Sequence, residues 1–264
     1  MKLGIIGAGN MASAIIGGII KKEILGKNDI ICSSPVESER NKAKESFGIA
    51  VTADNKEVVE KAEIILFAVK PQVIPAVAAE LKDQVDENKL IISIVAGKTI
   101  AWFNEAFGKK LKIVRTMPNT PALVGEGMTG VSPSDEVTEE ELAEVMKILS
   151  SFGEAEVVPE KIMEAVVSVS GSSPAYVFMM IEAMADGAVR LGMPRNKAYK
   201  FAAQAVYGSA KMVLETGKHP GELKDMVCSP AGTTIEAVRV LEDKGFRSSL
   251  IEAMEACADI SRKL

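Results

Sequence analysis

Short apolar runs rich in isoleucine and valine recur through the N-terminal half of the chain, with helical stretches between them. They occupy residues 2–6, 29–32, 63–69, 90–96 and 111–114. The runs are apolar on both faces, which is typical of strands in a parallel sheet covered by helices. Two weaker strands are predicted at residues 128–132 and 156–158, around a helix that Thr138 and Glu141 cap with a capping box.

Beyond Pro159 the pattern changes to long alanine- and methionine-rich segments with helical periodicity. The predicted helices cover residues 162–169, 174–191, 195–216, 221–226, 234–243 and 247–262. Several are apolar nearly all the way round, and a helical domain this small cannot bury every such face internally. We therefore expect an α/β protein with a Rossmann-type doubly wound sheet over residues 1–159. Residues 160–264 should form an all-helical dimerisation domain.

The stretch from Leu3 to Ile20 contains no charged residue. Its length admits a membrane span, and its basic start with small residues admits a signal peptide. Against both, it contains five glycines and divides naturally into a short strand, a Gly-Ala-Gly turn and a helix. We favour the strand, turn and helix.

Composition narrows the possible functions. The 264 residues are 47% apolar and 25% charged, as in ordinary globular proteins, and the net charge of -5 predicts no nucleic-acid partner and no membrane partner. Three cysteines, Cys32, Cys228 and Cys257, suit a reducing cytoplasm. The single histidine, His219, leaves no His/Cys cluster, so no metal is expected, and its place before Pro220 predicts an exposed or capping role.

The clearest motif is Gly7-Ala8-Gly9-Asn10-Met11-Ala12, which follows the first predicted strand and opens a helix. In such a turn Gly7 permits the sharp bend, Gly9 lets the backbone approach a pyrophosphate, and Ala12 allows close packing of helix on strand. The motif predicts dinucleotide binding, with a purely structural tight turn as the alternative.

The end of the second predicted strand bears on the choice of dinucleotide. Ser33 and Ser34 stand where an NAD-preferring site places a carboxylate, and no carboxylate follows until Glu37. Short hydroxyl side chains leave room for a 2'-phosphate, with Arg40 or Lys42 near in sequence. NADPH is therefore favoured, with NADH as the alternative cofactor. A second interpretation is that the two serines only cap the following helix.

Six segments give the chain a resemblance to a known family. They are Gly-Ala-Gly-Asn-Met-Ala at 7–12, Ala-Val-Lys-Pro-Gln at 68–72, Ile-Ser-Ile-Val-Ala-Gly at 92–97, Met-Pro-Asn-Thr-Pro at 117–121 with Gly-Glu-Gly at 125–127, Ser-Gly-Ser-Ser-Pro-Ala-Tyr at 170–176, and Leu-Lys-Asp-Met-Val-Cys-Ser-Pro-Ala-Gly-Thr-Thr-Ile at 223–235. In this order they resemble the pyrroline-5-carboxylate reductases. The family commonly has glycine at the positions of Ser173 and Ala231.

The resemblance implies hydride transfer from a reduced nicotinamide to the C=N bond of 1-pyrroline-5-carboxylate, the last step of proline biosynthesis. It also implies a helical half that binds the substrate and intertwines with a second copy, as a homodimer or higher homo-oligomer. The implied cofactor-binding residues are Gly7, Gly9, Asn10, Met11, Ser33, Ser34, Asn55, Ala68, Val69, Lys70, Pro71, Ala96, Gly97 and Asn119. Asn55 would lie near the adenosine ribose, and Ala96, Gly97 and Asn119 near the nicotinamide.

The implied substrate-binding residues are Ser229, Gly232, Thr233 and Thr234. The run from Thr233 to Glu236 predicts a capping box at the start of a helix. The N-H groups that the box leaves unpaired could hold a small carboxylate, and the Thr234 hydroxyl could donate to the ring nitrogen as the catalytic residue. Alternatively, that hydroxyl bonds the backbone within the turn.

Three other functions are weighed against the same sequence, and the absence of a lysine counts heavily against the first of them. β-Hydroxyacid dehydrogenases share this domain order but use a lysine on the helix that opens the second domain, and no lysine occurs between Ile162 and Asn196. A deazaflavin-dependent reductase shares the nucleotide domain without needing the helical half. A nicotinamide-binding regulatory protein would bind NADPH without turnover.

Overall fold

The computed structural model describes residues 2–263. These residues form two compact units. The first extends to Ser172 and includes the segment from Cys257 on, and the second comprises Ser173–Ala256. The domain boundary predicted near residue 160, between a dinucleotide-binding and a helical domain, stays a prediction.

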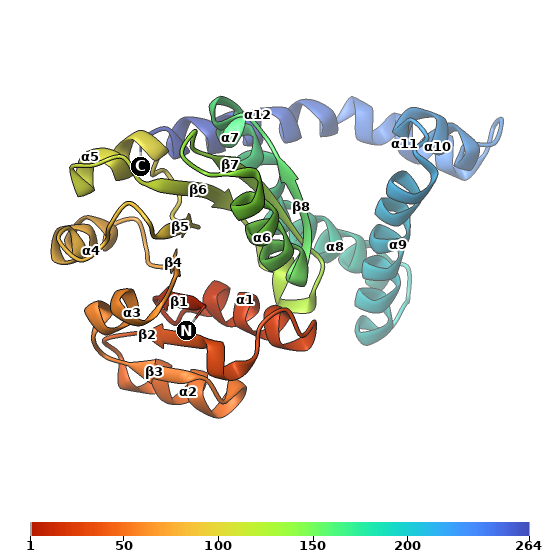
Figure 1. Ribbon diagram of the computed structural model, residues 1–264. Coiled ribbons are helices and arrows are strands. Elements are labelled where there is room, and N and C mark those ends of the chain that lie inside the picture. The colour runs from red at the N-terminus through yellow and green to blue at the C-terminus, as the bar shows by residue number, and fades with distance from the viewer. Residues whose placement is uncertain (1, 264) are drawn as a thin grey trace. The chain divides into compact units, whose positions relative to one another are not determined.

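The first unit is built on one eight-stranded sheet with the order β3-β2-β1-β4-β5-β6-β7-β8 (Figure 1). The strands are β1 Leu3–Ile6, β2 Ile30–Ser33, β3 Ala50–Thr52, β4 Ile64–Phe67, β5 Leu90–Ser93, β6 Lys112–Met117, β7 Gly127–Pro133 and β8 Gly153–Val157. Every pairing is parallel except that of β6 with β7. The strand order reverses between β1 and β4, and open sheets of this kind bind ligands beyond the carboxyl ends of the strands at such a reversal.

Helices cover both faces of this sheet and create two apolar cores (Figure 1). The helices are α1 Asn10–Lys21, α2 Glu37–Phe47, α3 Asn55–Lys61, α4 Ile74–Leu81, α5 Ile100–Phe107 and α6 Glu139–Leu149. Helices α1, α2 and α6 supply one core, whereas α3, α4 and α5 supply the other. Strands β1, β2, β4 and β5 are buried along their whole length, as the unbroken apolar runs predict.

Short helical turns complete the first unit. They are η1 Lys27–Asp29, η2 Thr120–Val124, η3 Ser150–Phe152, η4 Glu160–Ile162, α7 Met163–Val166 and the π-helix η5 Val167–Gly171. Buried Arg115 on β6 holds η4 and α7 against the sheet, because its guanidinium pairs with Glu160 and Glu164 at 3.2 Å each. Glu164 also accepts a hydrogen bond from Ser261, which ties the last helix to the same cluster.

The second unit consists of helices. They are α8 Ser173–Arg190, α9 Arg195–Thr216, α10 Pro220–Val227, α11 Thr233–Asp243 and α12 Phe246–Ser261, whose last turns belong to the first unit. Few side chains are buried where α8 and α9 pack, chiefly Ala185, Ala198 and Ala202. Large apolar side chains such as Phe178 and Phe201 are instead more than 60% exposed. This apolar surface is what the sequence pattern predicts for an interface between subunits.

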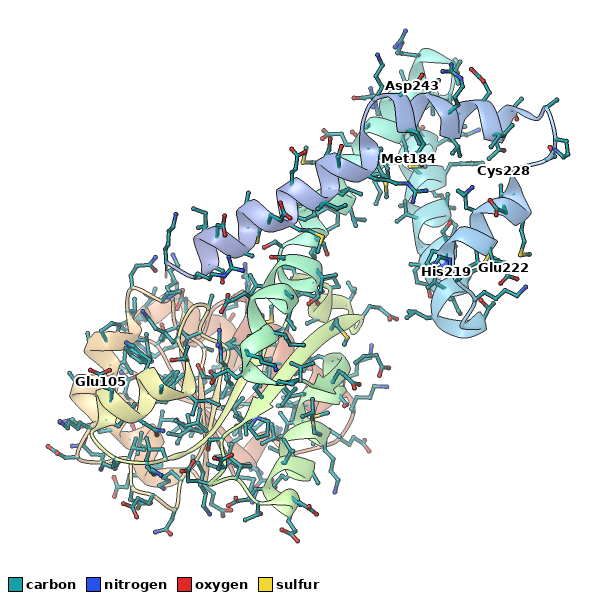
Figure 2. The ribbon with its side chains drawn as sticks, turned by 90° about the horizontal axis from the view of Figure 1, so that it is seen from above. Glu105, Met184, His219, Glu222, Cys228 and Asp243 are labelled. Carbon is teal, nitrogen blue, oxygen red and sulfur yellow. The ribbon has the colours of Figure 1, made fainter. Side chains whose placement is uncertain are left out.

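The predicted α/β class, sheet and C-terminal helices are confirmed. Strand β3 was not predicted. The uncharged stretch from Leu3 to Ile20 forms β1, the glycine turn and most of α1. Among the described residues, no helix is long and apolar enough to cross a membrane. The predicted Thr138–Glu141 capping box is present, and His219 caps α10 by accepting a hydrogen bond from the Gly221 N-H (Figure 2).

Candidate nucleotide and substrate sites

The glycine turn after β1 lies between the ends of two neighbouring strands. The Gly7 N-H donates to the Ser33 carbonyl at 2.9 Å, and the Ala68 N-H donates to the Ile6 carbonyl at 2.9 Å. Gly7 has φ +107°, and a Cβ built on it would lie 2.5 Å from the Ala68 carbonyl oxygen. Both its backbone conformation and its surroundings therefore require glycine.

Gly9 differs from Gly7, because the fold does not require a glycine at this position. Its φ of -74° and ψ of -172° suit any residue, and a Cβ built there would meet nothing within 4 Å. Gly9 is also the N-cap of α1, which has no side-chain cap and no acidic residue in its first turn. Open space in front of unpaired N-H groups at a helix N-terminus suits a pyrophosphate, so these residues fit a dinucleotide.

The residues expected near the adenosine ribose of the cofactor lie where β2 and β3 end. The Ser33 hydroxyl donates to Asn55 Oδ1 at 2.7 Å, and Asn55 Nδ2 donates to Glu80 Oε2 at 3.0 Å. The structure thus brings together two of the predicted cofactor residues that are 22 positions apart in sequence.

Ser34 lies beside this pair and is 2% exposed. Its hydroxyl donates to Glu39 Oε2 at 2.6 Å and accepts from the Val36 N-H at 3.1 Å, while Arg40 Nη1 donates to its carbonyl oxygen at 2.7 Å. The alternative that these serines cap α2 is wrong, because Val36 is the N-cap and no side chain caps the helix. Arg40, one of the two expected cations, does reach this site.

Glu39 is the residue that sequence reasoning missed here. It stands five positions after Ser34, and only the first turn of α2 brings its carboxylate back onto the serine hydroxyl. The sequence signal that could have indicated Glu39 is the helical stretch directly after the strand, because side chains in a first helical turn can face the preceding segment.

Buried Cys32 lies under the glycine turn, with Sγ 3.6 Å from the Gly7 carbonyl oxygen. Burial raises the pKa of the Cys32 thiol to about 12, and the Glu39 carboxylate adds to the rise. The thiol is therefore a neutral packing group at this site.

The next predicted cofactor residues follow the carboxyl ends of β4 and β5. Ala68 and Val69 are half-buried, and Lys70 is exposed ahead of Pro71. The Lys70 carbonyl accepts from the Val73 and Ile74 N-H groups, which starts α4 and holds the segment in place. Ala96 and Gly97 form a half-buried turn after β5, in which Gly97 has φ +74°.

Asn119 follows β6 and is buried, with both ends of its amide paired. Its Nδ2 donates to the Ser170 carbonyl at 3.0 Å, and its Oδ1 accepts from the Met128 N-H at 2.8 Å. These bonds join the end of β6 to β7 and to the π-helix η5. A π-helical turn is often found at functional sites. The predicted place of Asn119 near the nicotinamide stays a prediction.

The expected substrate loop lies between α10 and α11, directly after Cys228 (Figure 2). The Gly232 N-H donates to the Ser229 carbonyl at 3.0 Å, and a Cβ on Gly232 would lie 2.3 Å from Ser229 Oγ. Ala231 has φ +55°, a left-handed conformation that favours glycine. Ala231, one of the two residues at which this chain departs from the resembled family, thus occupies a backbone position suited to glycine.

The predicted Thr233–Glu236 capping box is wrong. Helix α11 begins at Thr233, its N-cap is Gly232, and no side chain caps it. Glu236 pairs instead with Arg239, with oxygen to nitrogen distances of 2.7–3.0 Å. The first-turn N-H groups of α11 therefore lack a side-chain acceptor, which leaves more donors for a carboxylate than the sequence predicted.

Thr234 is half-buried in the first turn of α11. Within residues 2–263, its hydroxyl makes no hydrogen bond, so the alternative that it bonds the turn backbone is not seen. The Thr233 hydroxyl likewise has no partner in this part of the chain.

Sequence comparisons match the whole chain. Residues 160–264 match the family described as pyrroline-5-carboxylate reductase dimerisation, and residues 2–97 match the family described as NADP oxidoreductase coenzyme F420-dependent. A pyrroline-5-carboxylate reductase of Escherichia coli (strain K12) is 54% identical over 263 residues, which is 100% of this chain and 98% of that protein. The chain belongs to the pyrroline-5-carboxylate reductase family. Another such reductase, from Methanosarcina acetivorans, is 44% identical over 100% of this chain and 97% of its own length.

Solved pyrroline-5-carboxylate reductases have the same fold. The enzyme from Coxiella burnetii is 34% identical with a TM-score of 0.92, covering 99% of this chain and 97% of that one. The Plasmodium falciparum enzyme, solved with NADP bound, is 32% identical with a TM-score of 0.91, covering 100% and 97%. A prephenate dehydrogenase from A. aeolicus, 14% identical with a TM-score of 0.54, shares the fold alone.

Within residues 2–263 of this reductase family member, no three His, Cys, Asp or Glu side chains lie together in a group that could hold a metal ion. The match to the F420-dependent family covers residues 2–97, which contain strands β1 to β5, whereas the relatives cover the whole chain. The dinucleotide-binding fold is therefore what this chain shares with the deazaflavin-dependent enzymes.

Proposed function

We propose that this protein reduces 1-pyrroline-5-carboxylate to L-proline with NADPH, as the last step of proline biosynthesis. Membership of the reductase family over the full chain supports the reaction. The structural observation that supports dinucleotide binding is the open, uncapped N-terminus of α1 at Gly9, which follows β1 at the reversal of strand order between β1 and β4. NADH is the alternative cofactor.

The cofactor is proposed to lie along the carboxyl ends of the parallel strands. Gly9, Asn10 and Met11 would receive the pyrophosphate on the α1 N-terminus, and the Ser33, Ser34 and Asn55 group the adenosine ribose. Segments 68–71 and 96–97 would line the nicotinamide end of the cofactor site. Asn119 would hold the end of β6 in place beside them through its bonds to Ser170 and Met128. When bound, the reduced nicotinamide supplies the hydride that adds to the imine carbon.

The substrate is proposed to bind at the start of α11. Free N-H groups in the first turn attract a carboxylate by about 0.3–2 kcal/mol per helix terminus, depending on exposure. The unpaired Thr234 hydroxyl would donate to the ring nitrogen and orient the imine, with Ser229 and Gly232 shaping the loop. Because a threonine hydroxyl is a poor acid, the net proton would come from solvent.

The helical half is proposed to pair with a second copy of the chain. Its exposed side chains include Phe178, Met179 and Leu214, which are apolar groups that an interface would cover, and residues 160–264 match a dimerisation family. We assign nucleotide binding to residues 1–159, and substrate binding with dimerisation to residues 160–264. Three unpaired cysteines favour a reducing cytoplasm.

The deciding experiment is NADPH oxidation with 1-pyrroline-5-carboxylate, followed by the loss of NADPH absorbance. Thr234→Ala should lower kcat about 10- to 1000-fold with the fold and NADPH affinity retained, the range for one lost preorganised donor. Thr233→Ala is the matched control. It keeps the first-turn backbone N-H through which Thr233 would bind the carboxylate and removes only a hydroxyl that caps nothing, so its kcat should stay within a few-fold of that of the parent. NADPH binding without turnover by the parent would instead support a regulatory nicotinamide-binding protein.

A further inference from the structure

Glu39 carries an inference about cofactor choice that deepens, and rests on, the proposed function. We propose that Glu39 is a specificity-determining residue that disfavours the 2'-phosphate of NADPH and favours the 2'-hydroxyl of NADH. The consequence is a reductase that discriminates weakly between the two cofactors, although the serines at the end of β2 by themselves favour NADPH.

The hydrogen bond between Ser34 and Glu39 carries the first step. Ser34 Oγ has a single proton, and at 2.6 Å it donates that proton to Glu39 Oε2. A phosphate oxygen only accepts hydrogen bonds, so Ser34 serves a 2'-phosphate only after it releases Glu39. The released carboxylate then stands next to a second anion, and like charges in contact disfavour binding.

A 2'-hydroxyl meets the opposite situation at the same carboxylate. It donates to Glu39 while the bond between Ser34 and Glu39 remains in place, as a carboxylate does for the ribose in NAD-preferring sites. Glu39 thus supplies, from the first turn of α2, the acidic group that the end of β2 lacks.

Arg40 explains why NADPH is not excluded altogether. Its Nη1 is held on the Ser34 carbonyl oxygen at 2.7 Å, which keeps a cation within the same turn. A guanidinium has five N-H donors and binds phosphate well, so the subsite pairs one anion with one cation. The carboxylate of Glu80 accepts a hydrogen bond from the amide of Asn55, whereas the carboxylate that Ser34 bonds is that of Glu39. Glu39 is therefore the anion whose removal changes this balance.

The test is calorimetric titration with two cofactor fragments, 2',5'-ADP and 5'-AMP, which differ only in the 2'-phosphate. Glu39→Gln keeps the size and the acceptor for Ser34 but removes the charge. It should lower the Kd of 2',5'-ADP about tenfold relative to that of 5'-AMP. The ratio of kcat/KM for NADPH over NADH should rise in parallel.

Glu37→Gln is the matched control, since Glu37 is an exposed carboxylate at the start of the same helix. It should change the ratio of the two Kd values less than twofold, and Glu39→Ala, the second variant, should reproduce the effect of Glu39→Gln. An unchanged Kd ratio in both Glu39 variants, or an equal fall of the Kd ratio in Glu37→Gln, overturns the proposal. The fragment titrations need no turnover, so failure of the proposed reaction would appear separately, as a parent inactive on 1-pyrroline-5-carboxylate.

Discussion

Substituting Gly9 by alanine should separate the requirements of cofactor binding from those of folding. Alanine adopts φ -74° and ψ -172° without strain, and its Cβ would meet no protein atom within 4 Å. Replacing glycine at such a position stabilises a protein by about 0.4–1 kcal/mol, because the unfolded chain loses freedom. For a protein of this size, that gain corresponds to a rise in Tm of about 1–4 °C.

The same methyl group stands in the space assigned to the pyrophosphate. Loss of one charge-assisted hydrogen bond costs about 1.5–3 kcal/mol, so the Kd for NADPH should rise about 10- to 100-fold. The assay is thermal unfolding by circular dichroism alongside calorimetric titration with NADPH. Gly26→Ala, in an exposed loop with φ -72° and ψ 153°, is the control that should keep its affinity.

Two results would refute this reasoning. Unchanged NADPH affinity in Gly9→Ala would show that the pyrophosphate does not approach Gly9. A fall in Tm of several degrees would show that the fold requires glycine at this position. Gly7→Ala gives the contrasting outcome, because its Cβ would lie 2.5 Å from the Ala68 carbonyl oxygen, and this variant should lose stability along with affinity.

The remaining predictions concern the loop, the buried thiol and the assembly. Ala231→Gly should raise the free energy of unfolding by up to about 1 kcal/mol in urea titrations, since glycine adopts φ +55° without a Cβ clash; a loss of stability would contradict this. Cys32 should resist iodoacetamide in the native protein at about pH 8 and react after denaturation, as read by peptide mass spectrometry, because its thiolate is scarce. Light scattering should give at least a dimer, and an active monomer on dilution would contradict the interface assigned to residues 160–264.

The sheet and most helices could be predicted because each reflects a local pattern. Strands β1, β2, β4 and β5 are buried on both faces and therefore carry unbroken apolar runs. Strand β3 escaped prediction because it is three half-buried residues, Ala50–Thr52, at the edge of the sheet and paired only with β2. An edge strand this short leaves no periodic signal.

The site was predictable at its glycines but not in its side-chain pairing. The residues of a capping box stand at Thr233 and Glu236, yet the left-handed Ala231 and the turn from Ser229 to Gly232 start α11 one residue earlier. Glu236 is then free to pair with Arg239. The bond from Ser33 to Asn55 joins two strand ends through the start of α3, and the bond from Ser34 to Glu39 depends on the exact residue at which α2 begins; sequence spacing does not determine either.

The path of the chain at Ser172 and Cys257 makes the helical unit an insertion rather than a tail. The chain leaves the first unit after Ser172 and re-enters it at Cys257, and the Cys257 thiol donates to the Ser172 hydroxyl at 3.1 Å. Entry and exit points that touch allow an inserted module to be exchanged or shortened while the host sheet keeps its connections. A fusion partner joined after the last helix would accordingly be carried by the first unit, which contains the sheet.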